Sequence, residues 1–222
     1  MVDLWYDNEI SRGILAKKYY HDGETSPEQF ISRVSSIYSK DIRDDVKKAL
    51  ENADFCPAGR ILYGAGSKGK FKATMSNCFI LPASKTDSMD GIFDLAKDMA
   101  KTFSYGGGVG TTISTLRPKG AKTNNSAKTS TGAVSFMNIL NEVGNIVGSN
   151  GRRSATMMGL DCDHPDLYEF LHIKEGNNKL ASMNISILFT DEFMRAVRDN
   201  KEFRLNFYVT EKDENIEEVI NA

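Results

Sequence analysis

Three cysteines are the residues of this chain with the clearest capacity for redox chemistry: Cys56, Cys78 and Cys162. They lie far apart and are odd in number, which fits neither a disulfide framework nor a Cys-x-x-Cys zinc site. We therefore expect free thiols, one of them a candidate reactive group. Cys78 lies in a predicted strand, where the usual fate of a thiol is burial as a small apolar side chain. Without further context, that structural role is favoured.

Four glycines crowd into five residues, at Gly106, Gly107, Gly108 and Gly110, and a β-branched run predicts a strand over 109–113. Glycine permits positive φ and close approach of another group, so a ligand could rest on this bare backbone. The pattern is neither a Walker loop nor a Rossmann fingerprint. A structural turn and a nucleotide contact therefore remain equal alternatives.

The strand leaves through Arg117-Pro118-Lys119-Gly120 into a polar loop over 122–131. The Lys, Asn, Ser and Thr side chains of that loop suit a phosphate-bearing ligand. Asp87-Ser88 precedes an amphipathic segment and predicts the start of a helix over 88–103. An acid, a base and a polar loop are thus expected beside one strand.

The remaining elements must position these groups. Helices are predicted over 8–21, 26–51, 134–147, 163–172 and 190–198, and a second strand over 77–81. Residues 56–63 are predicted to form a turn into a short strand, and further strands are predicted at 155–160 and 183–188. The tail from 203 is expected to hold one short strand and a weak acidic helix. Five strands interleaved with helices are typical of an α/β protein with a largely parallel sheet or barrel.

Composition narrows the class of function. The 222 residues are 40% hydrophobic and 26% charged, as in ordinary globular proteins, and the formal net charge of −2 argues against a nucleic-acid partner. No apolar run of spanning length and no signal-peptide pattern occurs, so we expect no membrane association and a cytoplasmic location. His164 has no second ligand at useful spacing, and no metal site is expected.

Taken together and in order, eight motifs resemble the large catalytic subunit of ribonucleotide reductase, and they are most similar to its adenosylcobalamin-dependent branch. The motifs are Pro57-Ala58-Gly59-Arg60-Ile61-Leu62, Asn77-Cys78-Phe79, Asp87-Ser88-Met89-Asp90-Gly91-Ile92-Phe93, Gly106-Gly107-Gly108-Val109-Gly110, Leu116-Arg117-Pro118-Lys119-Gly120-Ala121, Gly151-Arg152-Arg153, Asp161-Cys162-Asp163-His164-Pro165-Asp166, and Asn184-Ile185-Ser186 with Thr190-Asp191-Glu192-Phe193. One departure is Ser154, where the family usually has glycine.

The resemblance implies a ten-stranded α/β barrel made of two five-stranded halves, with a radical-bearing cysteine on a central finger loop. This chain would be an N-terminal helical region over 1–54 and the first half-barrel over 55–222, ending before the finger loop. We therefore expect either an incomplete record of a longer protein or one piece of a split enzyme. The implied activity of the complete enzyme is reduction of ribonucleotides by thiyl-radical chemistry. The alternative is a non-catalytic, deoxynucleotide-binding half-barrel.

The resemblance also implies roles for individual residues. Cys78 would be a catalytic reducing thiol, which reverses the preference for a structural role. The implied substrate-binding residues are Gly59, Asn77, Cys78, Gly107, Gly108 and Arg152. The implied effector-binding residues are Asp87, Ser88 and Arg117, because a carboxylate suits a ribose hydroxyl and a guanidinium suits phosphate. Tight packing for Gly59, a helix cap for Asp87 and a solvated turn for Arg152 remain the alternatives.

The implied ligands and partners follow from the same resemblance. They are a ribonucleotide substrate, a deoxynucleoside triphosphate effector, adenosylcobalamin, a thioredoxin-like or glutaredoxin-like reductant and a C-terminal half. Helices 88–103 and 134–147 would pair across a homodimer interface. The residues leave open whether the radical comes from cobalamin or from a metal-containing partner, and whether the substrate is a diphosphate or a triphosphate.

Overall fold

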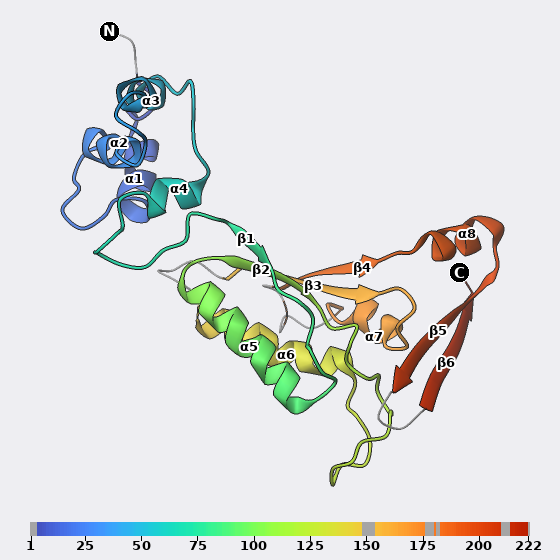
Figure 1. The fold of residues 1–222 in the computed structure, drawn as a ribbon. Helices are drawn as coiled ribbons and strands as arrows, with labels where there is room; N and C mark the ends of the chain where they lie inside the picture. The colour runs from blue at the N-terminus through green and yellow to red at the C-terminus, as the bar shows by residue number, and fades with distance from the viewer. Residues whose placement is uncertain (1–3, 148–153, 176–179, 181–182, 210–213, 222) are drawn as a thin grey trace. The chain divides into compact units, whose positions relative to one another are not determined.

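The structure is a computed structural model that describes residues 4–147, 154–175, 180, 183–209 and 214–221. The chain divides into two units, Met1–Asn77 and Cys78–Ala222, which are drawn in Figure 1 and described separately. Within the described part of the chain, no helix is both long enough and apolar enough to cross a bilayer.

The first unit is helical. Its helices are α1 (Glu9–Lys18), α2 (Pro27–Ser35), α3 (Arg43–Glu51) and α4 (Gly59–Gly64). Helix α2 begins as predicted, because the Ser26 side chain accepts the Gln29 N–H and Pro27 occupies the first turn. The predicted single helix over 26–51 is wrong, since a turn over 36–42 separates α2 from α3.

Helix α4 replaces the short strand predicted within 56–63, so the described residues form four parallel strands and not five. The reason is a tertiary contact from α2. The Arg33 guanidinium donates to the carbonyl oxygens of Leu62, Ala65 and Tyr19, which fixes the backbone at the end of α4. A short apolar run does not by itself distinguish strand from helix.

The core of the first unit forms where the apolar faces of these helices meet. Its buried members are Tyr6, Leu15, Phe30, Ile31, Val34, Leu50 and Ala65.

The second unit is built on a parallel sheet in which strand order follows chain order, β1-β2-β3-β4. The strands are β1 (Cys78–Ile80), β2 (Gly108–Thr112), β3 (Thr156–Asp161) and β4 (Met183–Leu188). All four lie where the sequence predicted strands. Helix α5 (Met89–Ser104) joins β1 to β2, and α6 (Ala133–Ile146) joins β2 to β3, which confirms the α/β class.

Helices α5 and α6 cover one face of the sheet (Figure 1). The apolar stripes of both helices meet the inward side chains of β2, β3 and β4 there. The largest fully buried side chains of this core are Phe103, Phe170, Ile113, Leu116, Met99, Met137, Leu140, Met158, Leu160 and Leu180.

The opposite face of the sheet carries exposed side chains. One row in register across the strands is Ile80, Gly110, Met157 and Asn184. Ile80 is 92% exposed and Met157 is 46% exposed. Cys78 lies two residues before Ile80 and is also exposed, so it belongs to this open face.

The last elements are α7 (Leu167–His172), α8 (Asp191–Asp199) and an antiparallel hairpin of β5 (Glu202–Val209) and β6 (Glu214–Asn221). Helix α8 lies where a helix was predicted, and the Thr190 hydroxyl caps it by accepting the Phe193 N–H. Two predictions are corrected. Helix α7 starts at Leu167 and not at 163, and the expected acidic helix is strand β6. The buried side chains of this part of the unit form a small hydrophobic cluster, which consists of Cys162, Leu167, Ala196, Phe203 and Leu205.

Candidate nucleotide site and thiol

The predicted effector residues Asp87 and Arg117 are in direct contact. The Arg117 Nε donates to Asp87 Oδ2 at 2.7 Å, and the Arg117 backbone N–H donates to Asp87 Oδ1 at 3.0 Å. Another guanidinium nitrogen donates to the Lys122 carbonyl at 2.7 Å. The Arg117 side chain is 10% exposed and the Asp87 side chain is 25% exposed, so this ion pair is largely shielded from water.

Ser88, and not Asp87, caps α5. The Ser88 hydroxyl accepts the Gly91 N–H at 3.2 Å. Asp87 is thereby left to hold Arg117, which removes the helix-cap alternative for this carboxylate. The positive end of the 16-residue helix α5 lies directly after this pair.

The polar loop that follows Arg117 folds back on itself through backbone hydrogen bonds. The Gly120 N–H donates to the Ser130 carbonyl at 2.9 Å, and the Ser130 N–H donates to the Ala121 carbonyl at 2.7 Å. Nearer the tip, the Thr123 N–H donates to the Lys128 carbonyl. The loop, drawn in yellow-green in Figure 1, is therefore an ordered wall and not a loose connection.

These parts enclose a cavity of about 560 Å³. Its polar lining comes from the predicted residues Asp87, Ser88 and Arg117 together with the loop residues Thr123, Asn124, Asn125, Thr129, Ser130 and Thr131. The volume falls within the range typical of small-molecule sites. Sequence reasoning had grouped the acid, the base and the loop, and the structure brings them together.

Sequence reasoning missed the apolar side of the cavity, which is formed by Met89, Ile92, Leu116 and Phe136. A planar base would find apolar contacts on this side and polar groups opposite. The available signal was the spacing of Met89 and Ile92, which lie three residues apart at the start of a helix and therefore share a face.

Cys78 begins β1, and its backbone lies in register with Gly108 at the start of β2. The thiol is exposed on the open face of the sheet, unlike Cys162, which is buried beside Thr190. Gly108 presents no side chain there. The structure thus brings together two of the predicted substrate-site residues, Cys78 and Gly108.

Gly107 has a packing role. A Cβ atom at this position would lie 2.7 Å from the Phe79 ring and 2.9 Å from the Thr102 methyl group. Real Cβ atoms do not approach so closely, so glycine is required by the junction of β1, α5 and β2.

Of the other predicted substrate residues, two belong to the first unit and one is not described. Gly59 opens α4 in the first unit, where a Cβ atom would come within 3.0 Å of the Tyr19 hydroxyl. Asn77 is the exposed last residue of that unit. Arg152 lies outside the described residues.

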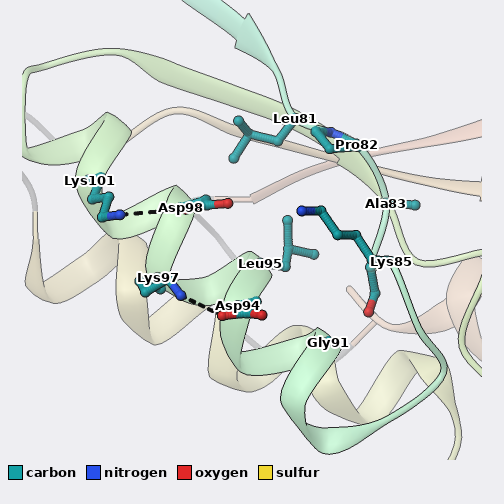
Figure 2. Close-up of a pocket in the computed structure, with 11 residues that line it drawn as sticks. Leu81, Pro82, Ala83, Lys85, Gly91, Asp94, Leu95, Lys97, Asp98 and Lys101 are labelled. Atoms are coloured by element: carbon teal, nitrogen blue, oxygen red, sulfur yellow. Dashed lines mark hydrogen bonds and ion pairs between the residues drawn. The ribbon is translucent and has the colours of Figure 1, made fainter.

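A second cavity, of about 240 Å³, lies between the β1–α5 connection and α5 (Figure 2). Lys97 and Lys101 pair there with Asp94 and Asp98. The hydrogen bond from Lys97 lowers the pKa of Asp94. None of the predicted site residues lines this cavity. Among the described residues, no cluster of three His, Cys, Asp or Glu side chains could hold a metal ion.

Comparison with known proteins places these features in a family. The family model for the ribonucleotide reductase barrel domain matches residues 76–220. A vitamin B12-dependent ribonucleoside-diphosphate reductase from Thermoplasma acidophilum is 35% identical over 159 residues, which cover 71% of this chain and 20% of that protein. The enzyme of the same name from Mycobacterium tuberculosis is 35% identical over 158 residues, covering 70% of this chain and 22% of that protein.

A solved structure has a similar fold. The α subunit of the class Id ribonucleotide reductase from Actinobacillus ureae matches with a TM-score of 0.70 and 18% identity, over 87% of this chain and 35% of that chain. The present chain spans about a fifth of the length of the two vitamin B12-dependent relatives.

Proposed function

The chain belongs to the family of the ribonucleotide reductase barrel domain, and from that premise we propose that it is part of an enzyme that reduces ribonucleotides to 2′-deoxyribonucleotides. The observation that carries the proposal is the exposed Cys78 thiol, in register with Gly108 on the open face of the parallel sheet. The rest of the catalytic barrel would come from sequence beyond these 222 residues, in the same polypeptide or in another chain. Synthesis of DNA precursors would take place in the cytoplasm.

In the proposed reaction a thiyl radical on the remainder of the enzyme abstracts a ribose hydrogen, which activates the neighbouring 2′-hydroxyl. The hydroxyl leaves as water with one proton, and the two thiols supply this proton, a second proton and two electrons as they form a disulfide. The hydrogen abstracted at the start then returns to the ribose, which regenerates the thiyl radical. We assign one of these thiols to Cys78 and the other to a cysteine in the remainder of the enzyme, outside these 222 residues. A thioredoxin-like or glutaredoxin-like protein would then reduce the disulfide by thiol exchange.

The substrate would lie over the start of β1 and β2. Gly108 is proposed as its backbone contact beside Cys78, and the neighbouring Gly107 as the turn that holds this backbone in place. Gly59, Asn77 and Arg152 are proposed as further contacts in the complete enzyme. A bare backbone allows a nucleotide to approach more closely than any side chain would permit.

The cofactor proposal rests on the two relatives named for vitamin B12, which suggest adenosylcobalamin as the radical source. We propose that the cofactor binds to the remainder of the enzyme, and no step assigned to this chain depends on it.

The cavity beside Asp87 and Arg117 is proposed to bind a deoxynucleoside triphosphate effector. Its support is the combination of an apolar wall for the base, a carboxylate for the ribose and a cationic group with a helix N-terminus for the phosphates. Loss of a charge-assisted contact costs roughly 1.5–3 kcal/mol, or about ten- to hundredfold in affinity. Asp87→Asn and Arg117→Ala should weaken nucleotide binding accordingly, as measured by calorimetric titration.

Asp94→Asn is the matched control for this titration, because Asp94 lies on helix α5, which follows Asp87 directly in the chain, but lines the other cavity. It should leave nucleotide affinity unchanged. If Asp87→Asn, Arg117→Ala and Asp94→Asn all bind nucleotide as tightly as the unaltered chain, the effector assignment is wrong.

A homodimer through α5 and α6 is proposed as well. Phe93 on α5 is 51% exposed and Ile146 at the end of α6 is 78% exposed, which leaves apolar surface on both helices. Because the nucleotide cavity is built from α5 and α6 residues, the effector should strengthen the association. Sedimentation should show this effect in the unaltered chain and its loss in Phe93→Glu. A monomer with and without nucleotide would contradict the proposal.

The catalytic assignment is tested by complementation. The 222-residue chain alone should reduce no ribonucleotide, and mixing it with the remainder of the enzyme, cofactor and reductant should give turnover. Cys78→Ser should abolish that turnover and leave nucleotide binding intact. Cys56→Ser removes another exposed thiol and should retain activity. Normal turnover by the Cys78→Ser complex would refute the role of Cys78, and a complemented complex that binds nucleotide without any turnover would favour a non-catalytic binding module.

A further inference from the structure

The turn between β3 and α7 holds a carboxylate that is almost fully buried. Asp166 is 6% exposed, and its two oxygens accept hydrogen bonds from two distant backbone groups. Oδ1 accepts the Lys119 N–H at 2.9 Å, and Oδ2 accepts the Ala133 N–H at 2.8 Å. Lys119 and Ala133 are the residues on either side of the segment 120–132. One side chain therefore ties together both ends of the loop that walls the nucleotide cavity.

The contact of Asp166 with Ala133 requires a glycine at position 132. Its φ of +93° lies in a region that L side chains rarely adopt, and a Cβ atom there would lie 2.8 Å from Asp166 Oδ2 and 2.9 Å from Lys119 Cβ. Helix α6 has no side-chain cap from its own N-cap residue. Asp166 supplies an acceptor for its first turn from 33 residues further along the chain.

His164 holds the backbone of Asp166 and extends the contact to the cavity wall. The ring is 2% exposed, and its Nδ1 accepts the Asp166 N–H at 3.0 Å. Because Nδ1 is an acceptor, Nε2 carries the hydrogen and donates to the Leu116 carbonyl at 2.9 Å. Leu116 lines the cavity and directly precedes Arg117.

We infer that Asp166, whose backbone is held by His164, is a positioning residue that holds the nucleotide-binding loop closed at its base. The inference rests on the proposed nucleotide site. Asp166 does not line the cavity, so its effect on a ligand would pass through the loop and the first turn of α6. The loop side chains from Thr123 to Thr131 meet the ligand in one arrangement only while both ends of the loop are fixed.

Asp166→Asn tests the inference with little change in volume. An amide has one oxygen, so it can accept only one of the two N–H groups well, and its NH₂ group faces the other donor. We expect affinity for deoxynucleoside triphosphates to fall on the order of tenfold, the usual effect of losing a hydrogen bond to a charged group. Hydrogen exchange at the Lys119 or Ala133 amide should accelerate in the same variant.

Asp163→Asn is the matched control, since it makes the same chemical change three residues earlier in the same turn. It should leave both affinity and exchange unchanged. Phe170→Leu, in the buried core of α7, controls for a general loss of stability. Measured well below its unfolding temperature, Phe170→Leu should bind nucleotide normally, whereas a purely structural role for Asp166 would make the two variants behave alike.

Gly132→Ala provides the same test from the loop side if Asp166→Asn does not fold. It should lower affinity in the same way, and the double variant should lose little more than either single variant, because both break one contact. Equal affinity in the unaltered chain, Asp166→Asn and Gly132→Ala would overturn this inference alone. Absence of binding by the unaltered chain would overturn the proposed effector site and this inference with it.

Discussion

Two glycines near the start of β2 have different reasons for lacking a side chain. A Cβ atom at Gly107 would meet Phe79 and Thr102, whereas a Cβ atom at Gly110 would meet nothing within 4 Å. Overpacking of this kind costs about 1–3 kcal/mol. We therefore expect Gly107→Ala to lower the free energy of unfolding of the second unit by that amount, as measured by denaturant unfolding followed by circular dichroism.

Gly110→Ala is the internal comparison. It should change the free energy of unfolding by less than about 0.5 kcal/mol or raise it slightly, because alanine restricts the unfolded chain more than glycine does. If the two variants were equally stable, close packing would not be the reason for glycine at 107.

His21 makes the first unit sensitive to acid. The ring is 5% exposed, its Nε2 contacts the Tyr63 carbonyl at 2.7 Å, and its Nδ1 has no hydrogen-bond partner. Burial lowers the pKa of His21 below its ordinary value of 6.5, and the charge of Arg33 acts in the same direction. The unfolded chain therefore takes up a proton below pH 6.5 that the folded unit resists, so stability present above that pH is lost as the pH falls.

Fluorescence of the single tryptophan, Trp5, measures this effect, because Trp5 belongs to the first unit and bonds to the Leu50 carbonyl. The thermal midpoint should fall between pH 7.5 and pH 5.5 and should fall less in His21→Gln. A parallel fall in both proteins would assign the acid sensitivity to other groups.

At the scale of elements, one buried side chain joins α2 to α4. Arg33 pairs with Glu24 at 2.6 Å, and the two side chains are 8% and 12% exposed. Removing one partner of a buried pair leaves the other charge uncompensated and typically costs 3–5 kcal/mol. Arg33→Ala should therefore destabilise the first unit by about that amount, with the transition again followed by Trp5 fluorescence.

Arg12→Ala is the control for this measurement. Its ion pair with Asp7 has side chains that are 58% and 41% exposed, and such pairs contribute less than about 1 kcal/mol. A similar small loss for Arg33→Ala would mean that α4 is held by its apolar contacts and not by this guanidinium.

The elements that the sequence predicted well are those with a clear apolar pattern. Strand β4 and helix α5 lie where the pattern predicted them, and Asp87-Ser88 marked the start of α5. Helix α4 was missed because Arg33 donates hydrogen bonds to the backbone carbonyls at its end. A tertiary contact of this kind does not appear in a local sequence pattern. The acidic segment 214–221 was missed because its pairing with β5 outweighs its weak helical pattern.

The residues of the site also divide into those that the sequence predicted and those that it did not. Asp87, Arg117 and the loop were grouped because their residue types point to one ligand chemistry. Asp166 was not, because its partners Lys119 and Ala133 are 47 and 33 residues away and are backbone groups with no signature in the sequence.

At the scale of the whole molecule, the chain exposes apolar surface in two regions of its second unit. Ile80 on the open face is 92% exposed, and Met194 and Val197 on α8 are 53% and 44% exposed. Surface of this kind promotes association when no partner covers it. We expect the isolated chain to associate with rising concentration in sedimentation experiments even without nucleotide.

Met194→Asp with Val197→Asp should reduce this association, because it replaces apolar surface on α8 with charge. Arg198→Asp adds a carboxylate to the same helix without removing apolar surface and should have little effect. A nucleotide-free chain that stays monomeric at all concentrations would show that these side chains do not drive self-association.

The hydrogen bond between Asp166 and the start of α6 has a consequence for the growing polypeptide on the ribosome. Helix α6 and the nucleotide loop leave the ribosome before the residue that fixes them, because Asp166 follows Ala133 by 33 residues. At about 5–20 residues per second, the delay lasts roughly 2–7 seconds. During that time the nascent loop lacks the acceptor that holds its two ends, so we expect it to reach its folded arrangement only after translation delivers Asp166.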